Sequence, residues 1–259
     1  MNTIRIDIDA RGVATLTLSR PEKHNSLSAE MIDELTQAAA DLGTNNDVRV
    51  VVLTGEGASF CAGGDLGWMR EQFAADRATR MAEARKLAGM LGALNTLPKP
   101  LIGRVQGQAF GGGIGMMSVC DVAIAIKGEK FGLTETRLGL IPATISPYVL
   151  ARMGEGMARR VFMSARLFDT DEAVTLGLAA KAVDADMLDT AIEAEIKPYL
   201  SAAPGAVARS KKLARSMGLR IDDALIESTV EALADAWEDP ESHEGVSAFF
   251  EKRKPNWKA

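Results

Sequence analysis

The chain has 259 residues, of which 47% are hydrophobic and 25% are charged, as in an ordinary globular protein with one large core. Its formal net charge of −5 argues against binding to nucleic acid or to an anionic membrane, because such binding usually requires a basic face. A local basic pocket for an anionic cofactor is still compatible with that charge.

The sequence shows no targeting signal and no metal-binding pattern. Its first eight residues include an acidic side chain where a secretory signal would have an apolar core. The apolar run at residues 122–126 is far too short to span a bilayer. The two cysteines, Cys61 and Cys120, are widely spaced and form no ligand pattern with the two histidines. We therefore expect a reduced, cytoplasmic protein that binds no metal.

The first part of the chain alternates predicted strands and helices. Residues 12–18 alternate apolar and polar side chains like a strand with one buried face. Ser28 is a suitable N-cap for an amphipathic helix that Gly43 closes. The β-branched run at residues 48–53 predicts a buried strand, and it leads into a glycine-bearing turn at residues 59–65.

The middle of the chain repeats the order of strand, glycine-bearing turn and helix. A long amphipathic helix is predicted over residues 73–94 and ends before the break at Pro98 and Pro100. The elements that follow are a strand at 101–105, a glycine-rich turn at 107–115, a short helix at 114–120 and a strand at 122–126. This order favours a layered α/β core.

The chain changes character from about residue 201, after which no strand signal is left. Pro204 opens one helical stretch, and residues 221–237 and 245–252 form two more. These helices carry enough apolar residues to need a partner surface.

Glycines are densest in the segment GQAFGGGIG at residues 107–115. Such a segment lets the backbone approach a ligand closely, and the helix that starts near Ile114 would present free N–H groups and the positive end of its dipole. The turn at residues 59–65 follows another strand, so the two turns could direct two N–H donors at one oxygen, as in an oxyanion hole. The alternative is that the glycines only mark tight turns or helix–sheet packing. The glycine motifs for phosphate binding and the serine hydrolase motif do not occur.

From about residue 13 to residue 257 the chain resembles the crotonase (enoyl-CoA hydratase/isomerase) superfamily. The resemblance rests on five motifs in order: residues 20–27 (RPEKHNSL), 60–65 (FCAGGD), 107–121, 131–142 (FGLTETRLGLIP) and 248–255 (AFFEKRKP). It implies an α/β fold of the ClpP/crotonase type, a spiral of strand–strand–helix turns. Residues 1–200 would form the spiral core with the active site. Residues 201–259 would form a helical segment that builds trimers, which commonly pair into hexamers.

The resemblance also implies an acyl-CoA thioester substrate and no tightly bound cofactor, with coenzyme A entering as part of the substrate. The backbone N–H groups of Ala62 and Gly112 would bind the thioester oxygen. Glu135 matches the second of the two glutamates of the hydratases and would be the catalytic acid and base, helped by apolar neighbours that raise its pKa. Read without the resemblance, Glu135 is better explained as an ion pair with Arg137 or as a charge at the start of a helix.

Gly115 is the main departure from the two-glutamate hydratases, which carry their other carboxylate at this position. Members of the superfamily with one glutamate include double-bond isomerases and some hydratases of branched or glutaconyl-type substrates. We expect Gly115 to leave space for a water molecule or a polar acyl group. Residues 142–147 (PATISP) add a similarity to the methylglutaconyl-CoA hydratase subgroup.

The resemblance further implies a set of contacts to coenzyme A. Lys23 and His24 would lie near the nucleotide, and His24 is better explained as a surface turn residue near the cofactor than as a general base. Phe249 and Lys252 would reach coenzyme A held by a neighbouring subunit, unless they belong only to a packed helix face. The residues expected to bind the substrate or coenzyme A are Lys23, His24, Ala62, Gly63, Gly64, Asp65, Leu66, Gly112, Gly115, Phe249 and Lys252.

The expected function is hydration of a 2-enoyl-CoA, as in fatty-acid β-oxidation, by a cytoplasmic homotrimer or hexamer. One alternative is a Δ3,Δ2-enoyl-CoA isomerase that uses Glu135 alone. Another is a catalytically silent acyl-CoA-binding protein that kept the fold, although the retained Glu135 speaks against it. The partners are the acyl-CoA and other copies of the chain, without nucleic acid or membrane.

Overall fold

The computed structural model describes residues 1–258, and two β-sheets form its centre. The strands are β1 (Ile4–Ile8), β2 (Val13–Leu18), β3 (Val50–Gly55), β4 (Ser59–Cys61), β5 (Leu101–Val105), β6 (Gln108–Phe110), β7 (Val122–Ile126), β8 (Lys130–Gly132), β9 (Phe168–Asp169) and β10 (Lys181–Val183). The α-helices are α1 (Ala29–Thr44), α2 (Leu66–Ala74), α3 (Arg77–Thr96), α4 (Gly112–Val119), α5 (Ser146–Met153), α6 (Glu155–Phe162), α7 (Thr170–Thr175), α8 (Leu188–Ser201), α9 (Pro204–Ser216), α10 (Asp223–Glu238) and α11 (Pro240–Phe250). Three short 3₁₀ turns are η1 (Pro21–Lys23), η2 (Glu135–Leu138) and η3 (Ala185–Met187).

The chain winds through the two sheets as a spiral. The larger sheet has the strand order β1-β2-β3-β5-β7-β10 and the smaller sheet the order β4-β6-β8-β9. Each turn of the spiral places one strand in the larger sheet and the next in the smaller sheet, as in β3–β4, β5–β6 and β7–β8, before helical structure follows. Strands β2, β3, β5 and β7 pair in parallel, as do β4, β6 and β8. The predicted α/β spiral of strand–strand–helix turns is therefore confirmed.

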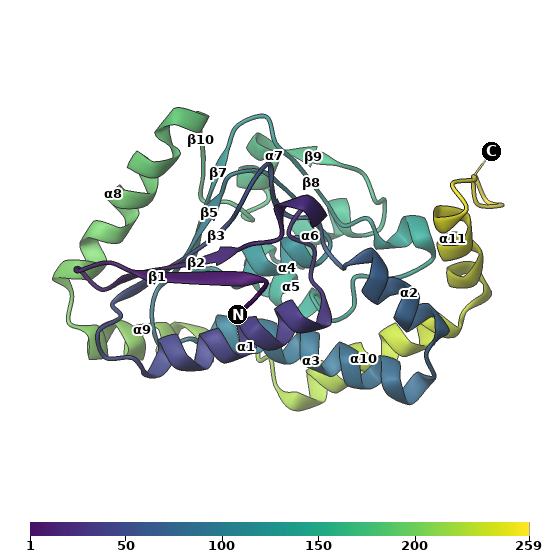
Figure 1. Ribbon diagram of the computed structural model, residues 1–259, viewed down its shortest axis with the longest axis horizontal. Helices are drawn as coiled ribbons and strands as arrows, with labels where there is room; N and C mark the ends of the chain where they lie inside the picture. Colours follow the sequence, from purple (N-terminus) through teal and green to yellow (C-terminus); the bar gives the residue numbers. More distant parts are fainter. Residues whose placement is uncertain (259) are drawn as a thin grey trace.

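Hydrophobic burial explains how helices cover the larger sheet. Every residue of β3 is buried, because the sheet has apolar cover on both faces. On one face, α8 packs Leu188, Ile192 and Ile196 against Val50 and Ile102. The other face joins the main core with α1, α3, α4 and α5. Figure 1 shows α8 on one side of the sheet, α1 and α3 on the other, and α11 at the far end beside the C-terminus.

Several predicted elements are confirmed, and two differ in informative ways. The strands at residues 12–18, 48–53, 101–105 and 122–126 are present as β2, β3, β5 and β7, and the Ser28 side chain caps α1. The predicted helix over residues 73–94 is instead two helices. The reason is a new N-cap at Asp76, whose Oδ1 accepts a hydrogen bond of 2.8 Å from the Thr79 N–H and so starts α3.

The second difference places the start of α4 at Gly112 instead of the predicted Ile114. This shift makes the second glycine of the triplet the first helical residue, whose N–H has no partner inside the helix. A Cβ on Gly113 would lie 2.2 Å from the carbonyl oxygen of Cys61, so the helix can pack on the end of β4 only with glycine at this position.

The C-terminal helices α10 and α11 pack against the rest of the chain. Buried Trp237 and Val246 form a cluster with Leu140, which follows η2. In contrast, α9 has no buried residue, and Leu213 and Met217 near its end are exposed. The assignment of residues 201–259 to oligomerisation stays a prediction. No helix within residues 1–258 has both the length and the apolar character needed to cross a membrane.

Two helical glycines give a matched test of the packing of α4 on β4. Gly113→Ala should lower the free energy of unfolding by about 3 kcal/mol, because its methyl group would overlap the Cys61 carbonyl. Gly89→Ala in α3 should raise the free energy of unfolding by up to about 1 kcal/mol, because nothing lies within 4 Å of the added Cβ and alanine favours the helix. Urea unfolding of both variants measures the difference, and equal stabilities would contradict the packing of α4 on β4.

Candidate active site

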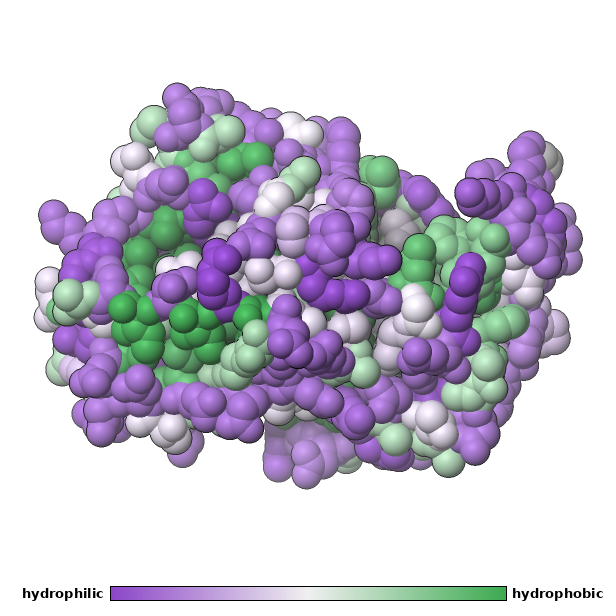
Figure 2. All heavy atoms as spheres, in the orientation of Figure 1, coloured by the Kyte–Doolittle hydropathy of each residue, from purple (hydrophilic) through white to green (hydrophobic). Residues whose placement is uncertain are grey.

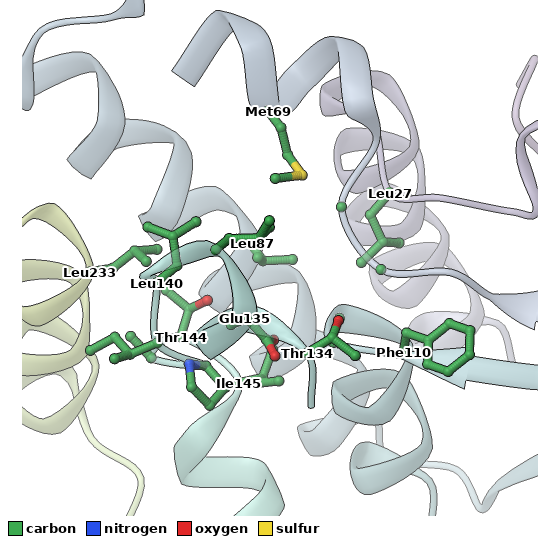
Figure 3. A pocket seen from close by; sticks show the side chains of 18 of the residues that line it. Leu27, Met69, Leu87, Phe110, Thr134, Glu135, Leu140, Thr144, Ile145 and Leu233 are labelled. Atoms are coloured by element: carbon green, nitrogen blue, oxygen red, sulfur yellow. The ribbon is translucent and has the colours of Figure 1, made fainter. Parts of the chain in front are cut away.

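A largely apolar cavity of about 510 Å³ lies between the glycine turns, η2 and the C-terminal helices. Its walls come from segments far apart in the chain, including Leu27, Met69 of α2, Leu87 of α3, Leu140 and Leu233 of α10. Figure 3 shows Glu135 among these side chains, near the middle of the view. On the molecular surface, apolar residues gather between the regions of α2 and α11 (Figure 2). Glu135 and Arg137 are the charged residues among the described lining of the cavity.

The two glycine turns meet at one wall of the cavity. They follow β4 and β6, which are parallel neighbours. A Cβ on Gly63 would lie 2.9 Å from the Phe110 oxygen and 3.5 Å from the Gly112 nitrogen, and a Cβ on Gly112 would lie 2.8 Å from a methyl group of Leu27. Gly63 also has a φ of +91°. The glycines therefore do more than mark turns, since any side chain here would separate the two segments.

The free N–H groups at this contact belong to Gly64 and Gly112. Within residues 1–258, neither has a hydrogen-bond acceptor, and both residues line the cavity. The neighbouring N–H groups are in use: Gly111 donates to Gly132 at 2.9 Å, and Asp65 donates to Leu27 at 3.0 Å. Gly112 also stands at the N-terminus of α4, where the helix dipole favours negative charge.

The structure corrects the expected role of Ala62. Its backbone N–H donates a hydrogen bond of 3.0 Å to the carbonyl oxygen of His24 and is not free for a substrate oxygen. The donor pair expected from the sequence, Ala62 and Gly112, is therefore wrong in its first member. The acceptor lies 38 positions earlier in the chain, so the turn sequence alone does not reveal which of its N–H groups is occupied.

Glu135 is the first residue of η2, and its carboxyl group lies beside the second glycine turn. Its Oε1 is 3.0 Å from the place that a Cβ on Gly111 would occupy, and Gly111 has a φ of +47°. Its Oε2 is buried and has no hydrogen-bond partner among the described residues. Burial raises the pKa of Glu135 to about 7, against the opposing effect of backbone N–H groups at Glu135 and Thr134. The alternative pairing with Arg137 is not seen among the ion pairs of residues 1–258.

Gly115 does not leave the open space expected from the sequence. It is buried in α4 and is not among the lining residues of the cavity. A Cβ at this position would lie 2.9 Å from Ile145 Cγ2, 3.2 Å from Ile145 Cβ and 3.5 Å from Leu91 Cδ1. The volume above Gly115 is therefore filled by the side chain of Ile145, which itself lines the cavity.

Other predicted binding residues divide into two groups. The residues that line the cavity are Ala62, Gly63, Gly64, Leu66, Gly112 and Phe249, and Trp68 and Met69 of α2 line it as well. The residues that do not line it are Lys23, His24, Asp65, Gly115 and Lys252. Phe249 lines the cavity of its own chain, although the resemblance implied a contact to a neighbouring subunit. A role of Lys23, His24, Asp65 and Lys252 in binding coenzyme A stays a prediction.

His24 and Asp65 hold the first glycine turn in place. The Nδ1 of His24 lies 2.9 Å from the Ser59 hydroxyl, and no carboxylate partner orients the ring among the described hydrogen bonds. Asp65 caps α2 and pairs with Arg20 at 3.0 Å. Burial opposes the charge of this carboxyl, but the N–H groups of Gly67 and Trp68 together with Arg20 lower its pKa. Both residues thus have structural contacts that fix the shape of the turn.

Some lining residues were not foreseen from the sequence. Leu233 and Trp237 line the cavity from α10, one helical turn apart. Their spacing of four residues marks one face of a helix, but that pattern alone does not distinguish a cavity wall from core. Ile145 was missed because it is an ordinary apolar residue of the segment at 142–147, and nothing in the sequence shows which space its side chain fills.

Comparison with known proteins gives a consistent result. Residues 9–259 match the family model described as Enoyl-CoA hydratase/isomerase. The Short-chain-enoyl-CoA hydratase of Clostridium acetobutylicum is 34% identical over 263 residues, which cover 98% of this chain and 97% of the relative. The crystal structure of an enoyl-CoA hydratase from Shewanella pealeana is similar with a TM-score of 0.81 and 38% identity, covering 99% of this chain and 96% of that one. One from Mycobacterium avium has a TM-score of 0.86 and 30% identity, with both chains fully covered at 100%.

The raised pKa of Glu135 predicts a pH-dependent cost to stability. The folded protein holds this proton more tightly than the unfolded chain, in which the pKa is near 4.5, so the contribution of Glu135 to stability is lost as the pH rises through about 7. Relative to Glu135→Gln, the parent should lose about 3 kcal/mol of unfolding free energy between pH 4.5 and a pH above 7. Urea unfolding of both proteins across this range measures the difference. A difference that stays constant with pH would show that the carboxyl is not desolvated.

Proposed function

The chain belongs to the enoyl-CoA hydratase/isomerase family, the crotonase superfamily, and on that premise we propose that it adds water across the 2,3-double bond of a 2-enoyl-CoA. One observation carries this proposal. A buried carboxyl group without a hydrogen-bond partner lies beside two free backbone N–H donors at the wall of one apolar cavity.

The two N–H donors would bind the thioester oxygen. When a nucleophile attacks the double bond, negative charge moves to this oxygen as an enolate forms. The N–H groups of Gly64 and Gly112 would stabilise that charge, with each donor worth about 3 kcal/mol of the barrier. The N-terminus of α4 contributes its dipole in the same place. Because these groups are held by glycine backbone, they need no rearrangement during the reaction.

Glu135 would move both protons in turn. As a carboxylate it takes a proton from water, and the resulting hydroxide bonds to C3 while the electrons of the double bond move to the enolate. The carboxyl group then gives its proton to C2 as the enolate collapses, and the sum is the addition of one water molecule. A pKa of about 7 suits both steps, because the group can accept and release a proton near neutral pH.

The leading alternative is a Δ3,Δ2-enoyl-CoA isomerase, which one observation favours. The volume above Gly115 holds Ile145 and Leu91 side chains, with no second carboxyl group to hold a water molecule. A single base in an apolar cavity can remove a proton at C2 of a 3-enoyl-CoA and return it at C4. The silent acyl-CoA-binding protein is disfavoured. A buried carboxylate without a partner destabilises the fold, so a protein that only binds acyl-CoA gains nothing from Glu135 beside the two N–H donors.

The finer assignment to branched or glutaconyl-type substrates, as in the methylglutaconyl-CoA hydratase subgroup, is part of the proposal. Arg137 lines the cavity and would pair with a carboxylate on the acyl group. We further propose a cytoplasmic role in acyl-CoA breakdown, with coenzyme A brought in as part of the substrate and no tightly bound cofactor.

We also propose that copies of the chain assemble through residues 201–259 into trimers or dimers of trimers. The support is the resemblance together with exposed apolar residues at the end of α9. Leu213 is 58% exposed and Met217 is 76% exposed, and a contact between subunits at the end of α9 would bury both side chains.

Replacement of Glu135 tests the chemical role. Glu135→Ala and Glu135→Gln should lower kcat by about 1,000-fold or more, since no second carboxyl group lines the described cavity. Binding of a saturated acyl-CoA should stay within about threefold of the parent, because the N–H donors and the apolar walls remain. Glu155→Gln, an exposed residue of α6, is the matched control and should keep full activity.

The assay uses a panel of enoyl-CoA thioesters with products identified by mass. A gain of one water identifies the hydratase, and a shifted double bond at unchanged mass identifies the isomerase. Turnover that survives in both Glu135 variants would refute the single-carboxyl mechanism, and no turnover of any substrate by the parent would favour the silent binder.

The assembly is tested by changing the exposed face of α9. Leu213→Glu combined with Met217→Glu should shift the sedimenting species from a trimer or hexamer toward monomers, because charges would be buried at the interface. Analytical ultracentrifugation of the parent and the variant decides this. A stable monomer in the unaltered protein would contradict the assembly outright.

A further inference from the structure

The close contact between Gly115 and Ile145 has a direct effect on the cavity. Gly115 is on α4, and Ile145 is the residue before α5, so the contact joins two helices that pack together. Two atoms of Ile145, Cβ and Cγ2, lie within 3.2 Å of where a Cβ on Gly115 would be. Distances of this size leave no room for any side chain at residue 115 while Ile145 keeps its place.

Ile145 has little freedom to give way. Its side chain is branched at Cβ and therefore stiff at its first torsion angle. The contact includes Cβ itself, so rotation of the side chain does not remove it. Leu91 closes the neighbouring space with its Cδ1 3.5 Å from the same point. Because the interior is already close-packed, a displaced Ile145 would move toward the cavity, the adjoining empty space.

The exposure of the lining residues shows which end of the cavity Ile145 occupies. Leu66 and Phe249 are 52% and 45% exposed and mark the mouth, whereas Ile145 and Leu87 are 3% and 9% exposed and mark the floor. A charged nucleotide must remain at the solvent-exposed mouth. The floor is therefore the acyl end. Figure 3 shows Ile145 close to the Glu135 carboxyl in this view.

We infer that Ile145, seated on the bare Cα of Gly115, sets the size of the acyl end of the cavity, so that these two residues together determine which acyl chains are accepted. This inference rests on the proposed function, since it concerns the acyl chain of the same thioester substrate. Gly115 acts through Ile145 and is a positioning residue. Ile145 contacts the acyl chain and determines specificity.

Two substitutions should move acyl preference in opposite directions. Ile145→Ala enlarges the floor, and the ratio of kcat/KM for an unbranched eight-carbon enoyl-CoA over the four-carbon one should rise by about 10-fold or more. Gly115→Ala pushes residue 145 into the cavity, and the same ratio should fall by about 10-fold. In the double variant the new methyl group fills part of the space left by Ile145, so its ratio should return toward the parent value.

Matched controls separate specificity from stability. Ile114→Ala removes a fully buried isoleucine next to Gly115 that does not line the cavity. Gly103→Ala in β5 introduces a methyl group 3.0 Å from the Cys120 sulfur, also away from the cavity. Both controls should be less stable than the parent and should keep its substrate ratio within about twofold.

Calorimetry of saturated four-carbon and eight-carbon acyl-CoA gives a second measure of acyl preference, the ratio of their dissociation constants, which does not require turnover. Ratios within about twofold of the parent in both Ile145→Ala and Gly115→Ala, or shifts in the same direction, would overturn the inference. If Gly115→Ala does not fold, Ile145→Ala decides alone. If the parent turns over no enoyl-CoA, the proposed function fails, while the binding ratios still decide the inference about size.

Discussion

The contact between the two glycine turns is the constraint on which the site depends. Gly63 and Gly112 meet at the ends of two parallel strands, where a Cβ on Gly63 would overlap the Phe110 carbonyl and a Cβ on Gly112 would overlap the Leu27 side chain. This contact sets the separation of the Gly64 and Gly112 N–H groups, since both belong to the touching turns. Gly111 has the same effect on η2. Only a residue without a Cβ at this position lets the Glu135 carboxyl lie so close to the second glycine turn. Steric exclusion thus positions all three polar groups.

The electrostatic consequence is that the Glu135 carboxyl group is close to half-ionised near neutral pH. Oε2 of Glu135 is buried, and no donor among the described residues is hydrogen-bonded to it. Desolvation therefore outweighs the backbone N–H groups and raises the pKa to about 7. Asp65, at the end of the first glycine turn, shows the opposite result. There Arg20 and two backbone N–H groups outweigh burial and lower the pKa. The two carboxyls differ in hydrogen-bond partners, and that difference separates a group able to move protons from one that fixes structure.

Local patterns in the sequence predicted individual strands and helices and a layered α/β core, whereas the spiral and the choice of Glu135 came from the resemblance to the superfamily. The alternation in residues 12–18, the buried run at 48–53 and the glycine triplet each describe a short segment that folds as its own composition directs. Ala62 and Gly115 were assigned incorrectly for one shared reason. The His24 carbonyl occupies the N–H group of Ala62, and the Ile145 side chain fills the space above Gly115. Both partners come from elsewhere in the chain. A motif specifies which backbone turns are possible. Tertiary packing decides which N–H groups of those turns are already hydrogen-bonded and which space beside them is filled.

The C-terminal helices connect these local arrangements to the whole fold. A Cβ on Gly139, directly after η2, would lie 2.5 Å from the backbone of Glu241, and a Cβ on Gly245 would lie 2.5 Å from the backbone of Leu138. The backbones of α11 and η2 are thus in direct contact, so the turn that bears Glu135 cannot shift without α11. The same helices supply Trp237 and Phe249 to the cavity wall. Docking of these helices therefore completes both the cavity and the position of its carboxyl group. If copies of the chain also assemble through this segment, as proposed, assembly and formation of the site become linked equilibria, and each stabilises the other.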